Sequence, residues 1–235
     1  MPSRAYRGQE LETFALASRW KAYVAEMLRP YIRGAVLEVG AGIGETTRVL
    51  LNEKVTSWLC LEPDAQLAAR LRQSAFPATK PQPQVVVSTL DDLNAENGFD
   101  TILYVDVLEH IASDRSELAR AACHLRTDGT LIVLAPAFNV LFSPFDRAIG
   151  HYRRYTRRSL SAVFPSDLRA QRTFYADSMG ALLSLANRLL MRQQMPTKNQ
   201  ILLWDRHVIP ISRIADRIMH RWIGRSVVAV YTRPA

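Results

Sequence analysis

The 235-residue sequence contains little cysteine, and its two cysteines, Cys60 and Cys123, have no CxxC spacing. Both lie in apolar or helical surroundings, which is typical of buried, reduced thiols in a cytoplasmic protein. Long apolar runs are also missing. The longest, residues 181–191, is too short to span a bilayer, and residues 1–7 precede a polar stretch that is unlike a signal peptide. We expect a cytoplasmic protein and predict no metal site.

Glutamate is absent from the last part of the chain. Residues 136–235 carry 16 lysines and arginines against five aspartates, a net charge of +11, whereas residues 1–135 carry a net charge of −3. Positive charge concentrated in one region attracts anionic partners such as phosphates, acidic glycans, nucleic acid or anionic lipid. A basic surface that only aids solubility is the alternative.

Strand-like and helix-like segments alternate through the first half of the chain. Apolar runs predict strands at residues 35–39, 56–61, 84–88, 99–105 and 130–135. Helices are predicted between them, at residues 45–51, 63–73 and 113–125. Because each strand is a nearly continuous apolar run, the pattern predicts a parallel sheet covered on both faces, in a doubly wound, Rossmann-like α/β fold.

We predict a single domain over residues 1–235, divided into a helical cap (1–33), a core (34–135) and a part that forms the substrate site (136–235). The cap contains one amphipathic helix over residues 11–28. The last part begins with a loop-like segment. Its predicted elements are the loop 137–160, a strand at 168–176, helices at 178–191 and 210–222, and a terminal strand at 226–231.

The strongest motif is VLEVGAGIGETT, between a predicted strand and a predicted helix. Its glycines, Gly40, Gly42 and Gly44, allow a sharp turn and a close approach of a ligand to the backbone. A dinucleotide site has a third glycine five residues after the first, but Glu45 stands there and would repel a pyrophosphate at the helix N-terminus. Together with Glu38, this loop suits a cationic ligand such as S-adenosylmethionine.

Acidic residues follow the next two predicted strands. Glu62 lies at the end of the second strand, where its carboxylate can accept both ribose hydroxyls of an adenosine ligand. A solvated acid is the alternative interpretation. Asp91 in STLDDL is placed to receive the adenine amino group, and Asp92 is its rival.

These motifs resemble motif I and the acidic post-I motif of class I S-adenosylmethionine-dependent methyltransferases. FDTILYVDVLEHI, residues 99–111, resembles the strand-four motif of their ubiquinone- and small-molecule-methylating branch. The resemblance covers residues 10–135. It implies a seven-stranded sheet of order 3-2-1-4-5-7-6 with strand seven antiparallel, and S-adenosyl-L-methionine as cofactor.

The resemblance also implies a role for each cofactor residue. Glu38, Gly40 and Gly42 fall near the methionine part, Glu62 at the ribose, and Asp106 close to the methyl group. The predicted cofactor set is Glu38, Gly40, Ala41, Gly42, Gly44, Glu62, Pro63, Leu90, Asp91 and Asp106.

Two missing signatures narrow the acceptor. The NPPY-like tetrapeptide of amino-methylating relatives is replaced by DVLE, and no cysteine stands near residues 106–109, which disfavours methylation of nucleic-acid bases. We therefore predict a small-molecule, glycan or lipid-linked acceptor and disfavour nucleic acid as a partner. RNA ribose methylation and a non-catalytic adenosine-ligand binding module are the alternatives.

The segment FDRAIGHYRRYTRRSL, residues 145–160, is the most distinctive of the basic part. Its GHxRRY element resembles that of a bacterial methyltransferase subgroup associated with glycosyltransferases and polyprenyl-phosphate sugar pathways. We predict that Arg153 or Arg154 binds an anionic group of the acceptor, and that Tyr23 and Tyr155 are further substrate contacts. Solvated arginines, or arginines paired with the acidic half of the chain, are the alternative.

His110 is the leading candidate base, because imidazole titrates near neutrality. A pocket wall is the alternative role. His151 and Asp106 complete the catalytic candidates, and Asp146 is a further alternative. A strong base is dispensable for a nucleophilic acceptor, because the sulfonium is already activated.

The helix over residues 210–222 carries an apolar stripe with arginines beside it. A packed surface helix is the default expectation, and an interfacial contact with anionic lipid on the inner face of the membrane is the alternative. The stripe consists of Ile211, Ile214, Ala215, Ile218 and Trp222.

Overall fold

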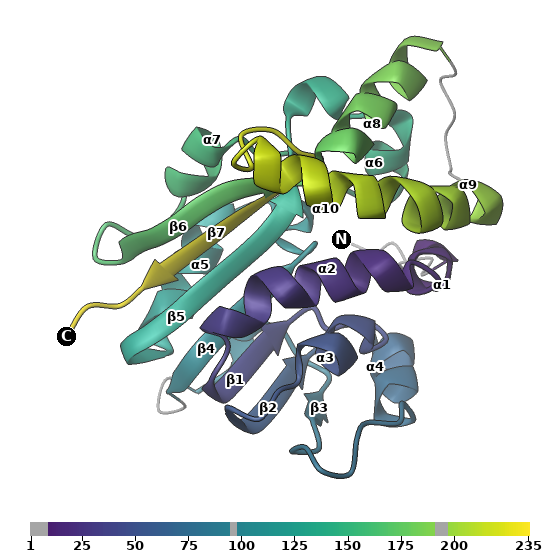
Figure 1. Ribbon diagram of the computed structural model, residues 1–235. Coiled ribbons are helices and arrows are strands. Elements are labelled where there is room, and N and C mark those ends of the chain that lie inside the picture. Colours follow the sequence, from purple (N-terminus) through teal and green to yellow (C-terminus); the bar gives the residue numbers. More distant parts are fainter. Residues whose placement is uncertain (1–8, 95–97, 191–196) are drawn as a thin grey trace.

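The computed structural model describes residues 9–94, 98–190 and 197–235, and its centre is a seven-stranded sheet. The strands are β1 Gly34–Val39, β2 Val55–Leu61, β3 Gln84–Val86, β4 Phe99–Val105, β5 Leu125–Pro136, β6 Arg169–Ala176 and β7 Ser226–Thr232. They are ordered β3-β2-β1-β4-β5-β7-β6, and β7 is antiparallel to both β5 and β6 (Figure 1). The predicted fold class, strand order and antiparallel seventh strand are confirmed.

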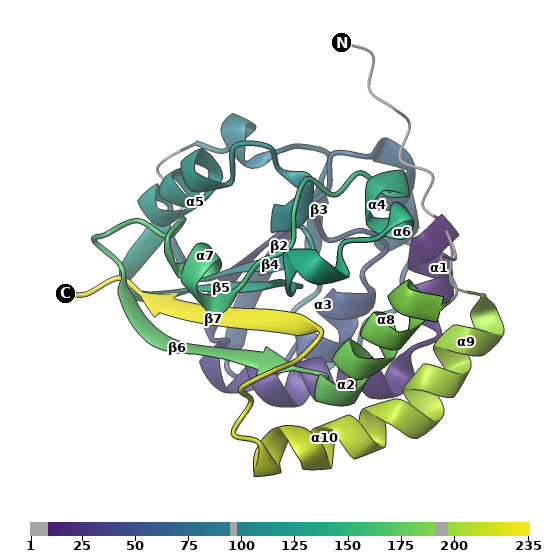
Figure 2. The same ribbon diagram turned by 90° about the horizontal axis from the view of Figure 1, so that it is seen from above.

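Helices cover both faces of the sheet. They are α1 Gln9–Ala15, α2 Ser18–Leu28, α3 Glu45–Leu50, α4 Ala65–Arg72, α5 Asp114–Cys123, α6 Pro144–Ala148, α7 Arg157–Ser161, α8 Ser178–Leu190, α9 Lys198–Leu203 and α10 Ile209–Ile218. Figure 2 shows α2 and α10 on one face and α5 and α7 on the other. In the described parts of the chain, no helix has the length and apolar character needed to cross a membrane.

Neighbouring residues of a central strand enter different hydrophobic cores. In β4, Ile102 packs in the core beneath α5, whereas the next residue, Leu103, packs in the core beneath α2. Both side chains are completely buried. Successive side chains of a strand point to opposite faces of the sheet, so a strand covered on both faces must be apolar throughout. This explains the nearly continuous apolar runs of the sequence.

The N-terminal cap is two helices, which corrects the single helix predicted over residues 11–28. The chain leaves helical geometry at Ala17, and α2 begins at the next residue. Asp205, far away in the sequence, accepts hydrogen bonds from the backbone N–H groups of Arg19 (3.1 Å) and Trp20 (2.8 Å). These N–H groups belong to the first turn of α2 and have no partner inside the helix, so the buried carboxylate of Asp205 stabilises a helix start there.

The segment predicted as a loop, residues 137–160, contains α6 and the first part of α7. Both helices start with a capping box, Ser143 with Asp146 and Thr156 with Ser159. Such reciprocal bonds stabilise helices that are too short to carry a clear apolar period. The helix predicted over residues 210–222 starts one residue earlier and ends at Ile218.

Candidate active site

The glycine loop joins β1 to α3 in the conformation that its sequence predicts. Gly40 has φ +68°, and a Cβ atom there would lie 2.7 Å from a methyl carbon of Val107. Gly44, the N-cap of α3, has φ +82°, and a Cβ atom there would lie 2.1 Å from Cδ1 of Leu71. An L-side chain would be strained in this left-handed geometry, and the neighbouring Val107 or Leu71 side chain would have to move to admit it, so both positions favour glycine.

Glu62 fastens the end of β2 to this loop. Its Oε2 accepts a hydrogen bond from the N–H of Gly42 (2.8 Å), and its Oε1 accepts one from the N–H of Asp64 (2.9 Å). Burial raises the pKa of Glu62, and the two backbone N–H groups oppose this rise. The carboxylate therefore lies at a fixed place beside the loop, with lone pairs left for a ligand.

A pocket of about 360 Å³ opens beside the loop. Seven of the predicted site residues line it: Gly40, Ala41, Gly42, Glu62, Pro63, Asp106 and His110. Its other wall comes from the N-terminal helices, through Leu11, Phe14, Trp20, Lys21 and Val24. Of these, Phe14, Trp20 and Val24 belong to the apolar side of the helix predicted over residues 11–28. An apolar stripe at helical spacing does not distinguish contact with a ligand from contact with a core.

Four predicted cofactor residues lie outside the pocket lining. Glu38 is buried behind the loop, where it accepts hydrogen bonds from Oγ1 of Thr47 (2.5 Å) and Nε1 of Trp58 (2.9 Å), and burial raises its pKa to about 7. Gly44 shapes the loop. Leu90 is buried, and the Asp91 carboxylate is paired with Arg120 at 2.7 Å.

Asp92, the rival of Asp91, is engaged in capping. Its carboxylate accepts hydrogen bonds from Ser88 and Thr89 as part of a capping box. These bonds hold the pKa of Asp92 below its usual range.

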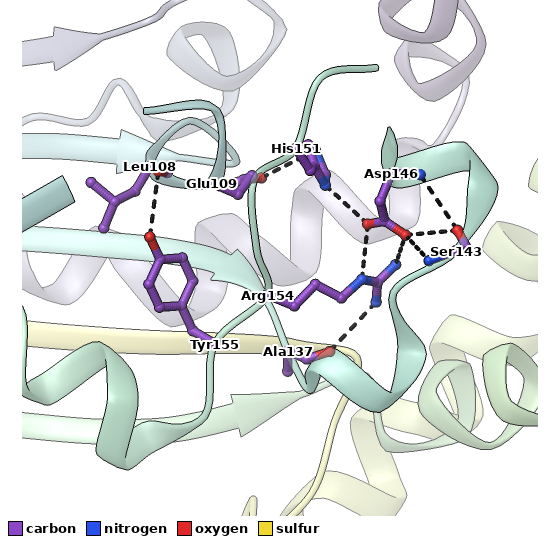
Figure 3. A network of polar contacts seen from close by, with 8 residues as sticks. All are labelled: Leu108, Glu109, Ala137, Ser143, Asp146, His151, Arg154 and Tyr155. Carbon is purple, nitrogen blue, oxygen red and sulfur yellow. Dashed lines mark hydrogen bonds and ion pairs between the residues drawn. The ribbon is translucent and has the colours of Figure 1, made fainter. Parts of the chain in front are cut away.

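The end of β4 meets the GHxRRY segment in a buried polar cluster, most of which Figure 3 shows. The His151 ring nitrogen Nδ1 lies 2.9 Å from Oδ1 of Asp146, and Nε2 lies 3.8 Å from Oε1 of Glu109. The ring of His110 packs edge-on against that of His151 with centroids 4.5 Å apart. Asp106, which has φ +54° at the end of β4, lies where this cluster meets the pocket.

Burial shifts the titration of these groups. It lowers the pKa of His110 to about 4, an effect that His151 increases. It raises the pKa of Asp106 to about 6, against the opposite effects of His151, Arg225 and Arg154. Burial also raises the pKa of Asp146, but the hydrogen bonds from His151 and Arg154 outweigh it, so this pKa lies below its usual range.

The arginines predicted to bind the acceptor make ion pairs inside the protein. Nε and Nη2 of Arg154 donate to the two carboxylate oxygens of Asp146, at 2.8 and 3.0 Å. Arg153 pairs with Asp114 at 2.5 Å. This geometry agrees with the alternative interpretation, in which these arginines pair with the acidic half of the chain, for Arg153 and Asp114. The partner of Arg154, Asp146, instead belongs to the basic part of the chain.

The two predicted tyrosines are buried as well. The hydroxyl of Tyr155 donates to Asp114 (2.8 Å), and that of Tyr23 donates to Asp216 (2.8 Å). Neither tyrosine lines the pocket, nor do the two arginines.

Residues 37–131 match the sequence model of a methyltransferase domain family. This segment contains the glycine loop, Glu62 and the end of β4. This part of the chain is therefore similar to a methyltransferase domain. No curated protein sequence matches the chain.

Solved methyltransferase structures share the fold of the whole chain. A chain from the complex between the Haloferax volcanii Trm112 methyltransferase activator and a methyltransferase has a TM-score of 0.64 at 16% identity, covering 97% of this chain and 93% of that chain. An S-adenosylmethionine-dependent methyltransferase from Clostridium acetobutylicum has a TM-score of 0.57 at 10% identity, covering 93% and 92%. The N-methyltransferase NodS from Bradyrhizobium japonicum, solved with S-adenosylhomocysteine, has a TM-score of 0.58 at 11% identity, covering 93% and 88%.

S-adenosylmethionine is the methyl donor that the matched methyltransferase family and the neighbour solved with S-adenosylhomocysteine imply, and the pocket fits its charge. The lining contains four carboxylates and one ammonium group, Lys21, which pairs with Glu45 at 2.6 Å. This acidic pocket lies in a chain of net charge +8. A pyrophosphate would be repelled there, whereas a ligand with sulfonium and ammonium groups is attracted.

Proposed function

We propose that the protein transfers a methyl group from S-adenosylmethionine to a small-molecule, glycan or lipid-linked acceptor that bears an anionic group. The observation that carries the cofactor part of this proposal is the acidic pocket between the glycine loop and Glu62, whereas the anionic group of the acceptor is inferred from the net charge of +11 over residues 136–235. When bound, the cofactor supplies a methyl group on a positively charged sulfur. The residues proposed to contact it are Gly40, Ala41, Gly42, Glu62, Pro63 and Asp106.

The remaining cofactor residues have supporting roles in this proposal. Glu38 and Gly44 shape the loop from behind. Leu90 and Asp91 are proposed to contact the adenine, which requires Asp91 to leave Arg120. Its carboxylate is 63% exposed, so exchange of that partner costs little.

The acceptor is proposed to lie beside Asp106 and His110, because these two of the three catalytic candidates line the pocket. Asp106 is the proposed proton acceptor. His151 stands behind His110 and positions it through their ring contact. Arg153 and Arg154 of the GHxRRY element are paired with Asp114 and Asp146. We therefore propose that these arginines stabilise the acceptor side of the site, and that other basic residues bind the anionic group of the acceptor.

A transfer assay with a radiolabelled methyl group tests this proposal. Purified protein would be incubated with labelled S-adenosylmethionine and separate lipid, glycan and RNA fractions. We expect label in the lipid or glycan fraction. Label confined to RNA would favour ribose methylation, and cofactor binding without any transfer would favour the non-catalytic alternative.

Two variants relate that transfer to the site. Asp106→Asn removes a proton acceptor, an effect that typically costs 100-fold or more in rate, and should change cofactor affinity less than tenfold. Glu53→Gln is the matched control, because the Glu53 side chain is 92% exposed and lies outside the pocket lining. Equal rates for Asp106→Asn and wild type would refute the role of Asp106.

The apolar stripe of α10 favours a lipid-linked acceptor. Ile214 and Ile218 are 62% and 72% exposed, and Trp222, just beyond the helix, is 69% exposed. The default expectation of a packed stripe is therefore wrong for these residues. Exposed leucines of α8 and α9 lie on neighbouring helices (Figure 2): Leu182, Leu183, Leu185, Leu202 and Leu203. Exposed apolar side chains in the basic part of the chain suit the surface of an anionic membrane.

Vesicle sedimentation tests this contact. We expect binding to vesicles that contain phosphatidylglycerol and weaker binding to pure phosphatidylcholine. Each isoleucine buried in the interface contributes about 1–2 kcal/mol, so Ile214→Ser with Ile218→Ser should weaken binding at least about tenfold. Val87→Ser, at an exposed valine next to β3, is the control. Equal binding by the double variant and wild type would refute the membrane contact.

A further inference from the structure

Three metal-ligating side chains converge beside the pocket. Glu109 and His110 follow β4, and His151 follows α6. One potential ligand atom from each residue lies within 4.8 Å of the other two. This site was not predictable from the sequence, because His151 lies far from the other two residues in the chain, and Glu109 and His110, as direct neighbours, have no familiar ligand spacing.

The carboxylate of Glu109 is completely buried. Neither of its oxygens accepts a hydrogen bond from another residue in the described parts of the chain. Nε2 of His151 lies 3.8 Å from Oε1 of Glu109, which is beyond hydrogen-bond distance. Buried carboxylates are normally hydrogen-bonded, paired or bound to a metal, so this group lacks the compensation that its burial requires.

The orientation of His151 is set from its other side. Arg154 binds both carboxylate oxygens of Asp146, which keeps this carboxylate an acceptor. Nδ1 of His151 therefore donates its proton to Asp146 (2.9 Å), and the lone pair of Nε2 points toward Glu109. A histidine that donates one ring N–H to a carboxylate and presents its other nitrogen is the usual arrangement of a metal ligand.

We propose that Glu109, His110 and His151 bind one divalent transition-metal cation. Two imidazoles and a carboxylate suit Zn²⁺, Co²⁺, Fe²⁺ or Mn²⁺ better than Mg²⁺ or Ca²⁺, which prefer oxygen ligands. The cation satisfies the Glu109 carboxylate and the Nε2 lone pair of His151 together. Three protein ligands leave a coordination position open.

The open position gives this cation a role in the reaction. His110 is both a ligand of the proposed cation and part of the pocket wall. The cation therefore orients the oxygen of a hydroxyl acceptor, which makes the reaction an O-methylation. This role rests on the proposed function, whereas the metal site itself does not.

Calorimetric titration of the metal-free protein with Co²⁺ and with Zn²⁺ tests the site. The protein would be prepared without a polyhistidine tag and stripped with a chelator. We expect one cation per chain and a rise in melting temperature with Zn²⁺. Glu109→Gln and His151→Asn should weaken Co²⁺ binding at least 100-fold, and Asp146→Asn, which only positions His151, should weaken it about tenfold to 100-fold.

His207→Gln is the matched control, because His207 is exposed and is not among the converging ligands; it should bind Co²⁺ as wild type does. Wild-type protein that binds less than one equivalent of either cation would overturn the proposal, whatever the folding of the variants. Folded Glu109→Gln and His151→Asn that bind as wild type does would also overturn it. The affinity for S-adenosylhomocysteine is measured in the same metal-free protein. Binding of S-adenosylhomocysteine without binding of a cation would contradict the metal site alone, whereas binding of a cation without S-adenosylhomocysteine would contradict the proposed function alone.

Discussion

Replacing Arg154 by alanine distinguishes a structural arginine from one that binds the acceptor. The Arg154 side chain is 10% exposed and that of Asp146 is 1% exposed, and two hydrogen bonds of 2.8 and 3.0 Å join them. Arg154→Ala leaves a buried carboxylate without its main partner. Breaking such a pair costs about 3–5 kcal/mol. We expect the lower value, because Ser143 and His151 still contact Asp146.

The free energy of unfolding, measured in urea with metal-free protein at neutral pH, checks this value. A loss of about 3 kcal/mol corresponds to a melting temperature lower by about 6–12 °C for a domain of this size. Arg154→Lys should recover only part, because an ammonium group cannot replace the two parallel bonds. Arg158→Ala, at an exposed position of α7, should stay within about 0.5 kcal/mol of wild type. Unchanged stability together with a collapse of turnover would refute this reasoning and favour direct binding of the acceptor.

Two further predictions concern the glycine loop and Glu38 behind it. Gly44→Ala should lower the free energy of unfolding in urea by at least about 2 kcal/mol, because the backbone is left-handed there and the new Cβ atom meets Leu71. Gly42→Ala should lower it by about 1 kcal/mol, because a Cβ atom at Gly42 meets no atom closer than 3.5 Å. Equal losses for the two variants would contradict the proposed clash with Leu71. Burial raises the pKa of Glu38 from its ordinary value of 4.5 to about 7 in the folded protein. The protonated side chain therefore stabilises the folded state by about 3 kcal/mol. This contribution is complete below pH 4.5 and is lost as the pH rises through 7. Glu38→Gln should remove this part of the pH dependence, measured by tryptophan fluorescence during urea unfolding. An unaltered pH profile in Glu38→Gln would exclude this contribution of Glu38.

Elements specified by their own residues were predictable from the sequence. The core strands were identified because a strand buried on both faces must be apolar throughout, as Ile102 and Leu103 illustrate. The glycine loop and Glu62 were found because a turn between strand and helix, followed by an acid at the next strand end, is a local pattern. Their convergence on one pocket follows from the parallel sheet.

Features that depend on partners distant in the sequence were not predictable. The break before α2 depends on Asp205, and nothing near Ala17 in the sequence indicates it. The roles of Arg154 and Glu109 depend on the residues that the fold places beside them, because an arginine is equally suited to an internal carboxylate and to an anionic acceptor. Periodicity located the stripe of α10 but did not show whether solvent or core lies against it.

Calorimetric titration with S-adenosylmethionine and S-adenosylhomocysteine tests the central claim most directly. We expect micromolar binding of both and no comparable binding of NAD. Each proposed ribose hydrogen bond to the Glu62 carboxylate would contribute about 1.5–3 kcal/mol at most, so Glu62→Ala should weaken binding about tenfold or more. Glu62→Gln, which keeps an acceptor oxygen for the N–H of Gly42, separates this loss from disorder of the loop. NAD binding tighter than that of S-adenosylmethionine, or wild-type affinity in Glu62→Ala, would contradict the cofactor assignment.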